Sequence, residues 1–357
     1  MSAASVEFEL TDLIDFAVNQ GNGVKGLSNL GIKTIPQKYI LPPEDRLNQN
    51  QIAQDESIAV IDVSNWDDPK IAASICEAAA KRGCFQIINH GIPLEVLENV
   101  KEARHKFFEL PDEERRKYLK ENSPTPTVQL KTSFSPLAEK VLEWKDYLTH
   151  LYIPDDESSK LWPSVSKDQV LEYIKWAKPI IRKLLELLLK GLNVKKIDET
   201  IESQLMGSLY VNLVYYPVCP NPELASGAGR HSDISAITIL LQDDVGGLFV
   251  QGTKADQWIH VTPVKGALVI NIGDVLQIVS NDRYKSVEHQ VTVNGRRNRV
   301  SVPIFVDPAA DTVVGPFPEA LESGEKPIYN HFVYSDYFNY FFSKGLGRKQ
   351  TIELAKK

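Results

Sequence analysis

Ser208-Leu-Tyr-Val-Asn-Leu-Val-Tyr-Tyr216 begins a run of short β-rich segments in the second half of this 357-residue chain. Gly, Asp, Asn and Pro separate the segments that come after it, at 236–241, 247–251, 256–261, 267–272, 286–292 and 299–306. Several short strands at this spacing are typical of an all-β sandwich or barrel. The sequence therefore predicts that the core of the fold is built from these strands.

Before residue 207 the patterns are mostly helical. The longest predicted helix covers 167–190, where apolar side chains recur at helical spacing and Ser166 with Gln169 predicts a capping box. Further helices are expected at 9–20, from Pro69 to just before Gly83, at 93–108 and at 111–119, and strands at 58–62, 84–88 and 143–148. The fold class is thus α+β, with a helix-rich region at 1–206, a β-rich core at 207–308 and an aromatic-rich segment at 309–357 that packs on the core.

Two connecting segments have sequences that resemble a phosphate-binding motif and an active-site loop. Gly21-Asn-Gly-Val-Lys-Gly26 matches the G-x-G-x-x-G pattern of dinucleotide-binding proteins, which requires a strand before the glycines and a helix after them. A helix is predicted before them instead, and Gly31 and Pro36 interrupt the segment after them, so we expect a flexible turn. Residues 121–137, rich in Pro, Ser and Thr, are expected to form a loop of the kind that often lines an active site.

The charge, the cysteines and the apolar runs of the chain limit its class of function and its cellular compartment. A net charge of −7 argues against general binding to nucleic acid or to a membrane surface. The three cysteines form no C-x-x-C pair, so neither a disulfide framework nor a zinc ribbon is indicated. No apolar run approaches the length of a membrane span, and the first twenty residues lack the apolar stretch of a signal peptide. The cytoplasm is the expected location.

His231 and Asp233 stand two residues apart, so on a β-strand both side chains would leave by the same face. A second imidazole, His289, lies in the predicted strand 286–292. Two imidazoles and one carboxylate are the ligands of a facial triad that binds non-haem Fe(II) and leaves positions open for substrate and oxygen. We therefore predict an Fe(II) site at these three residues and assign no catalytic side chain beyond them.

Arg299 and Ser301 form a second i, i+2 pair, and Phe305 comes after them with the same parity on one predicted strand. A guanidinium group binds a carboxylate through two hydrogen bonds, and a hydroxyl group beside it can donate one more. A co-substrate with a chelating head and a distal carboxylate would fit both this pair and the metal. 2-Oxoglutarate has this structure, because its keto acid can chelate iron while its far carboxylate meets the arginine.

The type, order and spacing of these residues resemble the signature of the plant soluble 2-oxoglutarate/Fe(II)-dependent dioxygenases. The resemblance extends over nearly the whole chain and includes Tyr215-Tyr-Pro-x-Cys-Pro220, Asn271-Ile-Gly-Asp274, Tyr284-Lys-Ser-Val-Glu-His289 and Phe85-Gln-x-x-Asn-His-Gly91. It implies a double-stranded β-helix, or jelly-roll, core that is wrapped by helices and carries the Fe(II) and 2-oxoglutarate site.

The resemblance also implies roles for single residues. His231, Asp233 and His289 would hold Fe(II), Arg299 and Ser301 would hold the 2-oxoglutarate carboxylate, Tyr216 would donate a hydrogen bond to it, and Phe305 would line the substrate pocket. Val214 departs from the pattern, because many members carry an Asn at this position that can contact the co-substrate.

Within that family, four segments resemble the hydroxycinnamoyl-CoA ortho-hydroxylases of coumarin biosynthesis: Gly21–Leu27, Thr132–Glu139, Glu143–Tyr147 and Tyr334–Tyr337. The resemblance implies ortho-hydroxylation of feruloyl-CoA, p-coumaroyl-CoA or both on the way to scopoletin and umbelliferone, with O₂ as co-substrate and ascorbate as a helper. Phe134 is a further candidate for the pocket, and Lys131, Arg296 and Arg297 are candidates for contacts with the CoA phosphates. Two alternatives stay open: a hydroxylase of a free coumarin, flavonoid or other small molecule, and a jelly-roll protein that binds metal without turnover.

Three structural predictions accompany these assignments. His90, at the end of strand 84–88, is expected to make a structural hydrogen bond rather than to bind metal. Asn294-Gly295 looks like a two-residue hairpin turn, but in a plain hairpin Arg299 and Ser301 would point away from the metal. We therefore predict a bulge, an additional loop residue, or passage of the chain from one sheet of the jelly roll to the other. The aromatic side chains of the C-terminal segment are expected to be buried by core packing.

Overall fold

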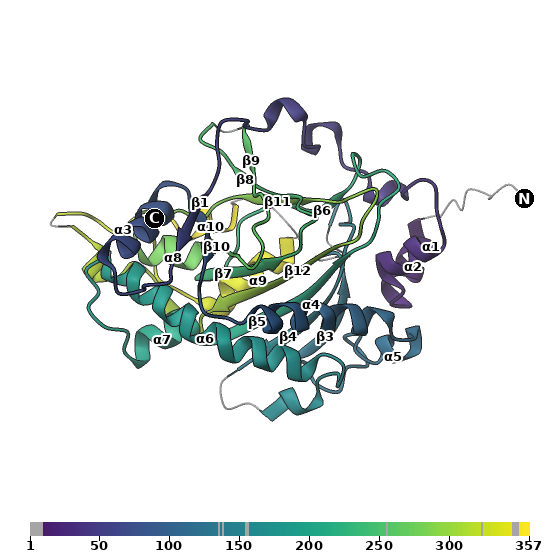
Figure 1. Ribbon diagram of the computed structural model, residues 1–357, viewed down its shortest axis with the longest axis horizontal. Helices are drawn as coiled ribbons and strands as arrows, with labels where there is room; N and C mark the ends of the chain where they lie inside the picture. The colour runs from purple at the N-terminus through teal and green to yellow at the C-terminus, as the bar shows by residue number, and fades with distance from the viewer. Residues whose placement is uncertain are drawn as a thin grey trace, which may run out of the picture.

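The computed structural model describes residues 10–134, 136–137, 139–153, 157–254, 256–322, 324–344 and 350–357. Its centre is a pair of sheets that lie one above the other (Figure 1). The larger sheet has the strand order β1-β2-β10-β7-β12-β5-β4-β3 and the smaller one has the order β6-β11-β8-β9. The strands of the larger sheet are Ala59–Asp62 (β1), Cys84–Ile88 (β2), Val128–Thr132 (β3), Asp146–Tyr152 (β4), Ser208–Tyr216 (β5), Ile237–Gln242 (β7), Leu268–Ile272 (β10) and Arg299–Asp307 (β12).

The smaller sheet consists of Ser226–His231 (β6), Leu248–Gln251 (β8), Trp258–His260 (β9) and His289–Thr292 (β11), and a separate pair consists of Val313–Val314 (β13) and Phe332–Val333 (β14). The α-helices are Leu10–Ile14 (α1), Gly23–Asn29 (α2), Pro69–Lys81 (α3), Leu94–Glu109 (α4), Asp112–Arg116 (α5), Lys167–Lys190 (α6), Glu199–Met206 (α7), Asp274–Val279 (α8), Tyr334–Lys344 (α9) and Gln350–Ala355 (α10). The other helical turns are the π-helix Asp15–Asn19 (η1) and the 3₁₀ turns Gln37–Tyr39 (η2), Pro43–Asp45 (η3), Gln49–Gln51 (η4), Glu157–Leu161 (η5) and Pro318–Ala320 (η6). This arrangement confirms the predicted α+β class.

Side chains alternate along each strand, so the two faces of the larger sheet carry different sets of residues. On β12, Val302 and Ile304 belong to the main hydrophobic cluster, which includes the buried faces of α4 and α6. Figure 1 shows both helices running beneath this sheet. The alternate residues of β12, from Arg299 to Phe305, face the smaller sheet and line a cavity between the two sheets. The helices thus anchor one face and leave the other for chemistry.

The connection at Asn294-Gly295 carries the chain from one sheet to the other. β11 pairs with β6 and β8 in the smaller sheet, whereas β12 pairs with β5 and β7 in the larger sheet. The Asn294 side chain stabilises the connecting turn by accepting hydrogen bonds from the Arg296 and Arg297 backbone at 2.7 and 3.0 Å. The prediction of a sheet-to-sheet passage is confirmed, and it allows Arg299 to share the cavity with His289.

Several local predictions are wrong where tertiary contacts outweigh the local sequence. Most of the supposed flexible turn at Gly21–Gly26 belongs to α2, because the buried Asp146 carboxylate accepts hydrogen bonds from the backbone of Val24 at 2.9 Å and Lys25 at 2.7 Å. The predicted loop at 121–137 contains β3, which pairs with β4 at the edge of the larger sheet. Ser166 does not cap α6, and its hydroxyl group lies 3.2 Å from His150 Nε2 instead.

Other elements either match their prediction or were not predicted. α6 covers the predicted residues 167–190. β6, which contains Gly227 and Gly229, was not predicted. Residue 9 of the predicted N-terminal helix lies outside the described residues, as do Ser135 and Ala138 of the Thr132–Glu139 motif. No helix in the described part of the chain combines the length and the apolar character needed to cross a membrane.

Candidate active site

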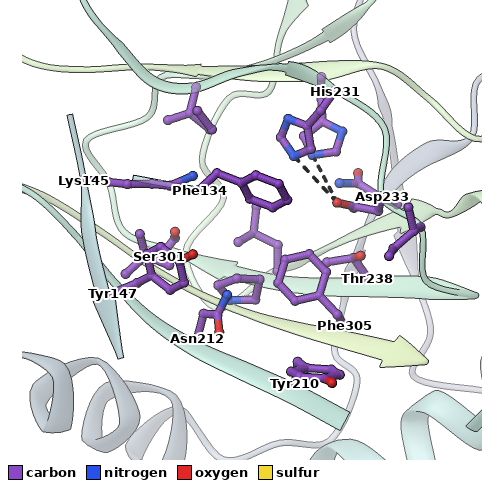
Figure 2. A pocket seen from close by; sticks show the side chains of 18 of the residues that line it. Phe134, Lys145, Tyr147, Tyr210, Asn212, His231, Asp233, Thr238, Ser301 and Phe305 are labelled. Carbon is purple, nitrogen blue, oxygen red and sulfur yellow. Dashed lines mark ion pairs between the residues drawn. The ribbon is translucent and has the colours of Figure 1, made fainter. Parts of the chain in front are cut away.

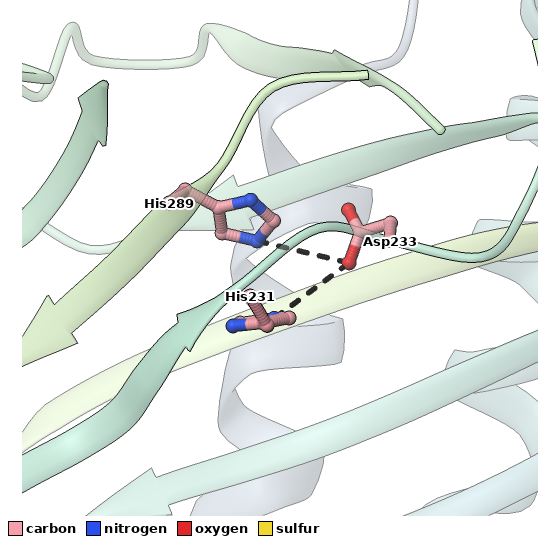
Figure 3. A group of neighbouring side chains, drawn as sticks. All are labelled: His231, Asp233 and His289. Carbon is pink, nitrogen blue, oxygen red and sulfur yellow. Dashed lines mark ion pairs between the residues drawn. The ribbon is translucent and has the colours of Figure 1, made fainter. Parts of the chain in front are cut away.

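His231, Asp233 and His289 converge between the two sheets (Figure 3). His231 ends β6 and lies opposite His289, the first residue of β11, so strand pairing brings the two imidazoles together. Asp233 Oδ1 lies 3.8 Å from His231 Nε2 and 3.7 Å from His289 Nε2. All three ligand atoms lie within 4.8 Å of one another, which is compact enough for them to bind one ion.

The surroundings of these side chains suit a metal. The Nδ1 atoms of His231 and His289 lie 2.7 and 3.3 Å from the carbonyl oxygens of Gly229 and Val287, which fixes the rings with Nε2 toward the carboxylate. Burial, followed by the neighbouring His289, lowers the pKa of His231 and so favours the neutral, ligand form. Asp233 Oδ2 is buried without a hydrogen-bond partner among the described residues. A divalent cation would complete this donor set.

The route by which Asp233 reaches the site differs from the prediction. β6 ends at His231, so Asp233 does not share a strand face with it. It lies in the connection to β7, where its backbone carbonyl accepts a hydrogen bond from Asp274 N, at the start of α8, at 2.8 Å. His231 and Asp233 thus lie together as predicted, but a turn rather than a shared strand face positions the carboxylate.

Arg299 and Ser301 line the same cavity from β12, where they pair with Tyr216 and Val214 of β5. Arg299 is 1% exposed, donates from Nε to the Gly246 carbonyl at 2.6 Å, and lies with its guanidinium carbon 4.8 Å from the centre of the Tyr216 ring. Its Nη1 atom is buried and has no hydrogen-bond partner among the described residues. A buried cation with an unused donor is suited to binding a carboxylate.

Aromatic side chains form one wall of the cavity, which has a volume of about 260 Å³. Phe134 stacks on Phe342 with ring centres 4.8 Å apart and meets the edge of Phe341 at 5.4 Å. Figure 2 shows Phe134 and Phe305 in the space between the metal-site residues and Ser301. Phe134 and Phe305, predicted from the sequence, are therefore brought together with the metal triad.

Two family models match the chain. The 2OG-Fe(II) oxygenase superfamily matches residues 207–308, and the model described as non-haem dioxygenase in morphine synthesis, N-terminal, matches residues 58–169. The chain belongs to the 2OG-Fe(II) oxygenase superfamily. As a member, it is a dioxygenase that uses Fe(II) and 2-oxoglutarate.

Relatives of this oxygenase span its whole length. A bi-functional coumaroyl CoA and feruloyl CoA ortho-hydroxylase of Ipomoea batatas is 54% identical and covers 100% of this chain and 99% of its own. Feruloyl CoA ortho-hydroxylase 1 of Arabidopsis thaliana is 55% identical, over 97% of this chain and 96% of its own. The crystal structure of JOX2 in complex with 2OG, Fe and JA is 32% identical, with a TM-score of 0.82 and coverage of 94% of this chain and 97% of that one. These similarities confirm the jelly-roll fold and the family inferred from the sequence.

Sequence reasoning missed several residues that line the oxygenase cavity. Phe338, Phe341 and Phe342 of α9 were assigned to core packing, yet they also form a wall of the cavity. Strand parity could have located Asn212 and Asp307, because they lie an even number of residues from the predicted Tyr216 and Phe305 and so face the same side of their strands. Burial raises the pKa of Asp307, which lines the cavity, to about 7.

His90, Arg296 and Arg297 lie outside the active-site cavity. His90 has the predicted structural role, since its Nε2 atom lies 2.8 Å from the Gly266 carbonyl and its Nδ1 atom accepts from Ile92 N at 3.2 Å. Arg297 is exposed and forms an ion pair with Asp244 at 2.7 Å. Neither Arg296 nor Arg297 is among the residues that line the cavity, whereas Lys131 is.

Proposed function

We propose that this oxygenase hydroxylates the aromatic ring of a hydroxycinnamoyl-CoA thioester, ortho to the propenoyl chain. His231, Asp233 and His289 would hold Fe(II), and Arg299, Ser301 and Tyr216 would bind the distal carboxylate of 2-oxoglutarate. The observation that carries the proposal is a single cavity in which three groups meet: the triad, the Arg299 Nη1 donor that has no partner in the described part of the chain, and a phenylalanine cluster. The names of relatives that are 53–55% identical support the choice of substrate.

Each group of residues would have a distinct task. When bound, Fe(II) would couple decarboxylation of 2-oxoglutarate by O₂, which yields succinate and CO₂, to insertion of the second oxygen atom into the ring C–H bond. Arg299 and Ser301 would fix the co-substrate at its far end, so that its keto acid reaches the metal side of the cavity. Phe134, Phe305 and the α9 phenylalanines would hold the ring flat and exclude water.

The product has a further reaction available. After trans-to-cis isomerisation, the new hydroxyl oxygen could attack the thioester carbonyl, forming a C–O bond and breaking the C–S bond, with the proton leaving on the CoA thiol. The ring would close to a coumarin, which is scopoletin from feruloyl-CoA and umbelliferone from p-coumaroyl-CoA. Ascorbate as a helper and the cytoplasm as the location are parts of the same proposal.

Product analysis tests the function. Purified protein with Fe(II), 2-oxoglutarate and ascorbate is offered feruloyl-CoA, p-coumaroyl-CoA, the two free acids, and free coumarins, and the products are measured by mass spectrometry. We expect a mass gain of one oxygen on a CoA ester, one succinate per product, and no product from the free acids. Equal activity on acid and thioester, or activity on coumarins or flavonoids alone, would remove this substrate and leave the oxygenase in place.

A further inference from the structure

A second cavity, of about 470 Å³, lies beside the active-site cavity. Lys131, Phe134 and Phe342 line both cavities, so these three side chains form a shared wall. The rest of its lining comes from the segment 17–23, the turn at 119–121, β3 with the residues that follow it, and Asp146. These segments lie at the β3 edge of the larger sheet, near α1, α2 and α5 (Figure 1). The two cavities are therefore adjacent, and Lys131 lines both of them.

The sizes of the cavities suit two parts of one molecule. The active-site cavity, at about 260 Å³, falls below the roughly 300–1,000 Å³ of pockets that enclose a drug-sized ligand. Because 2-oxoglutarate would occupy part of this volume, the cavity leaves no room for a nucleotide. A CoA thioester must therefore place its pantetheine arm and its phosphates outside this cavity, and the second cavity begins at the shared wall.

The charges of the second cavity also suit CoA. Lys120 and Lys131 both line it, and the Lys131 ammonium group has no hydrogen-bond or ion-pair partner among the described residues. Of the two acidic residues in its lining, Asp146 already accepts the Val24 and Lys25 backbone N–H groups, and Glu121 is exposed. The whole chain has a net charge of −7, so a polyanionic substrate needs a local basic site of this kind.

Hydrogen-bonding groups accompany the two lysines. The Asn22 amide lines the cavity but is satisfied within the protein, since Arg116 Nη2 donates to Oδ1 at 2.7 Å and Nδ2 donates to the Phe16 carbonyl at 2.9 Å. Gln129 of β3 adds an amide that also lines the cavity. A pantetheine arm carries two amides of its own, so it could exchange hydrogen bonds with this lining. Burial, followed by repulsion from Lys120, lowers the pKa of Lys131 to about 8, and an anion bound beside the ammonium group would favour its charged form.

We propose that the second cavity binds the pantetheine arm and phosphates of the substrate, with Lys120 and Lys131 as the phosphate contacts. This inference rests on the proposed function, since it specifies how the same site would distinguish a CoA thioester from smaller acyl compounds. Lys131 would stand at the junction of the two cavities, and Lys120, on the exposed turn, would lie nearer to solvent.

A pair of substrates tests this assignment. Feruloyl-CoA carries the phosphates, and the feruloyl thioester of pantetheine lacks them. We expect the wild-type oxygenase to prefer feruloyl-CoA in kcat/KM, and the preference to weaken with rising salt because the phosphate contacts are screened. Lys131→Met and Lys120→Met should each lower the ratio of kcat/KM for feruloyl-CoA to that for the pantetheine ester by about tenfold.

A control variant and a second test variant show what an unchanged ratio of kcat/KM values would mean. Lys117→Met changes an exposed lysine just before the turn at 119–121 that pairs with Glu114 and lines neither cavity, so it should keep the wild-type ratio. If Lys131→Met fails to fold, Lys120→Met, on the surface, still decides the matter. An unchanged ratio in the Lys120 and Lys131 variants would overturn the inference while the hydroxylation of thioesters stands.

If the wild-type protein hydroxylates neither thioester, the proposed function fails first. Calorimetric binding of free CoA to the Fe(II)-loaded protein then tests the cavity separately. Binding that Lys120→Glu weakens about tenfold would keep the cavity as a CoA site. No binding, or binding that this charge reversal leaves unchanged, would overturn it.

Discussion

Replacing Arg299 by glutamine removes the cation that we propose for the distal carboxylate of 2-oxoglutarate. The side chain is 1% exposed, and its Nη1 donor has no partner among the described residues, so little water can replace the lost contact. Truncating one partner of a buried, hydrogen-bonded charge pair costs about 2–5 kcal/mol. The lower figure corresponds to about a 30-fold weaker affinity, and we expect at least this loss for 2-oxoglutarate.

The assay measures this affinity directly and without turnover. 2-Oxoglutarate is titrated into Fe(II)-loaded protein under anaerobic conditions, and the dissociation constant is obtained by calorimetry. Arg297→Gln is the matched control, because Arg297 lies two residues away, is 58% exposed and pairs with Asp244 on the surface. It should bind 2-oxoglutarate as the wild type does. A dissociation constant for Arg299→Gln within threefold of the wild type, in protein with an unchanged melting temperature, would refute the clamp.

Three further changes test other parts of the structure. Asp233→Ala should abolish calorimetric Fe(II) binding and hydroxylation while near-UV circular dichroism stays unchanged, because the site is built on strands that pair without it; retained hydroxylation would refute the triad. Val214→Asn, opposite Ser301, should lower the 2-oxoglutarate KM by up to about tenfold if the amide reaches the carboxylate, and an unchanged KM would show that it does not. Burial lowers the pKa of His150 to about 3, so the unfolded state takes up the proton first and the free energy of unfolding falls as the pH drops below about 6.5. Between pH 7 and pH 5 this free energy should fall by about 2 kcal/mol more in the wild type than in His150→Gln. Denaturant titrations measure it at each pH, and an equal decrease in the two proteins would contradict the prediction.

Predictions that depend on local sequence agree well with the structure. β5 covers Ser208–Tyr216 and α6 covers Lys167–Lys190, as expected, because alternating or helical apolar patterns decide which face a segment can bury. The position of Arg299, Ser301 and Phe305 on one strand face results from the same alternation. Even the passage between sheets at Asn294-Gly295 could be inferred, since a plain hairpin contradicted the chemistry.

Predictions failed where a distant residue supplies the decisive contact. α2 forms at a glycine-rich segment because Asp146, more than 120 residues away, accepts two of its backbone N–H groups. β3 forms within a segment rich in Pro, Ser and Thr because β4 offers it an edge to pair with. No local pattern reports such partners.

The sequence by itself determined the chemistry of this oxygenase, because side-chain type and spacing define which metal and which co-substrate the chain can bind. The tertiary structure alone decided where that chemistry meets a substrate. Asp233 is held by a turn against α8, the α9 phenylalanines form a wall of the cavity, and Lys131 lines both this cavity and a second one. The physical reason is that a cavity is the space left between packed elements, and its shape depends on contacts between residues far apart in the chain.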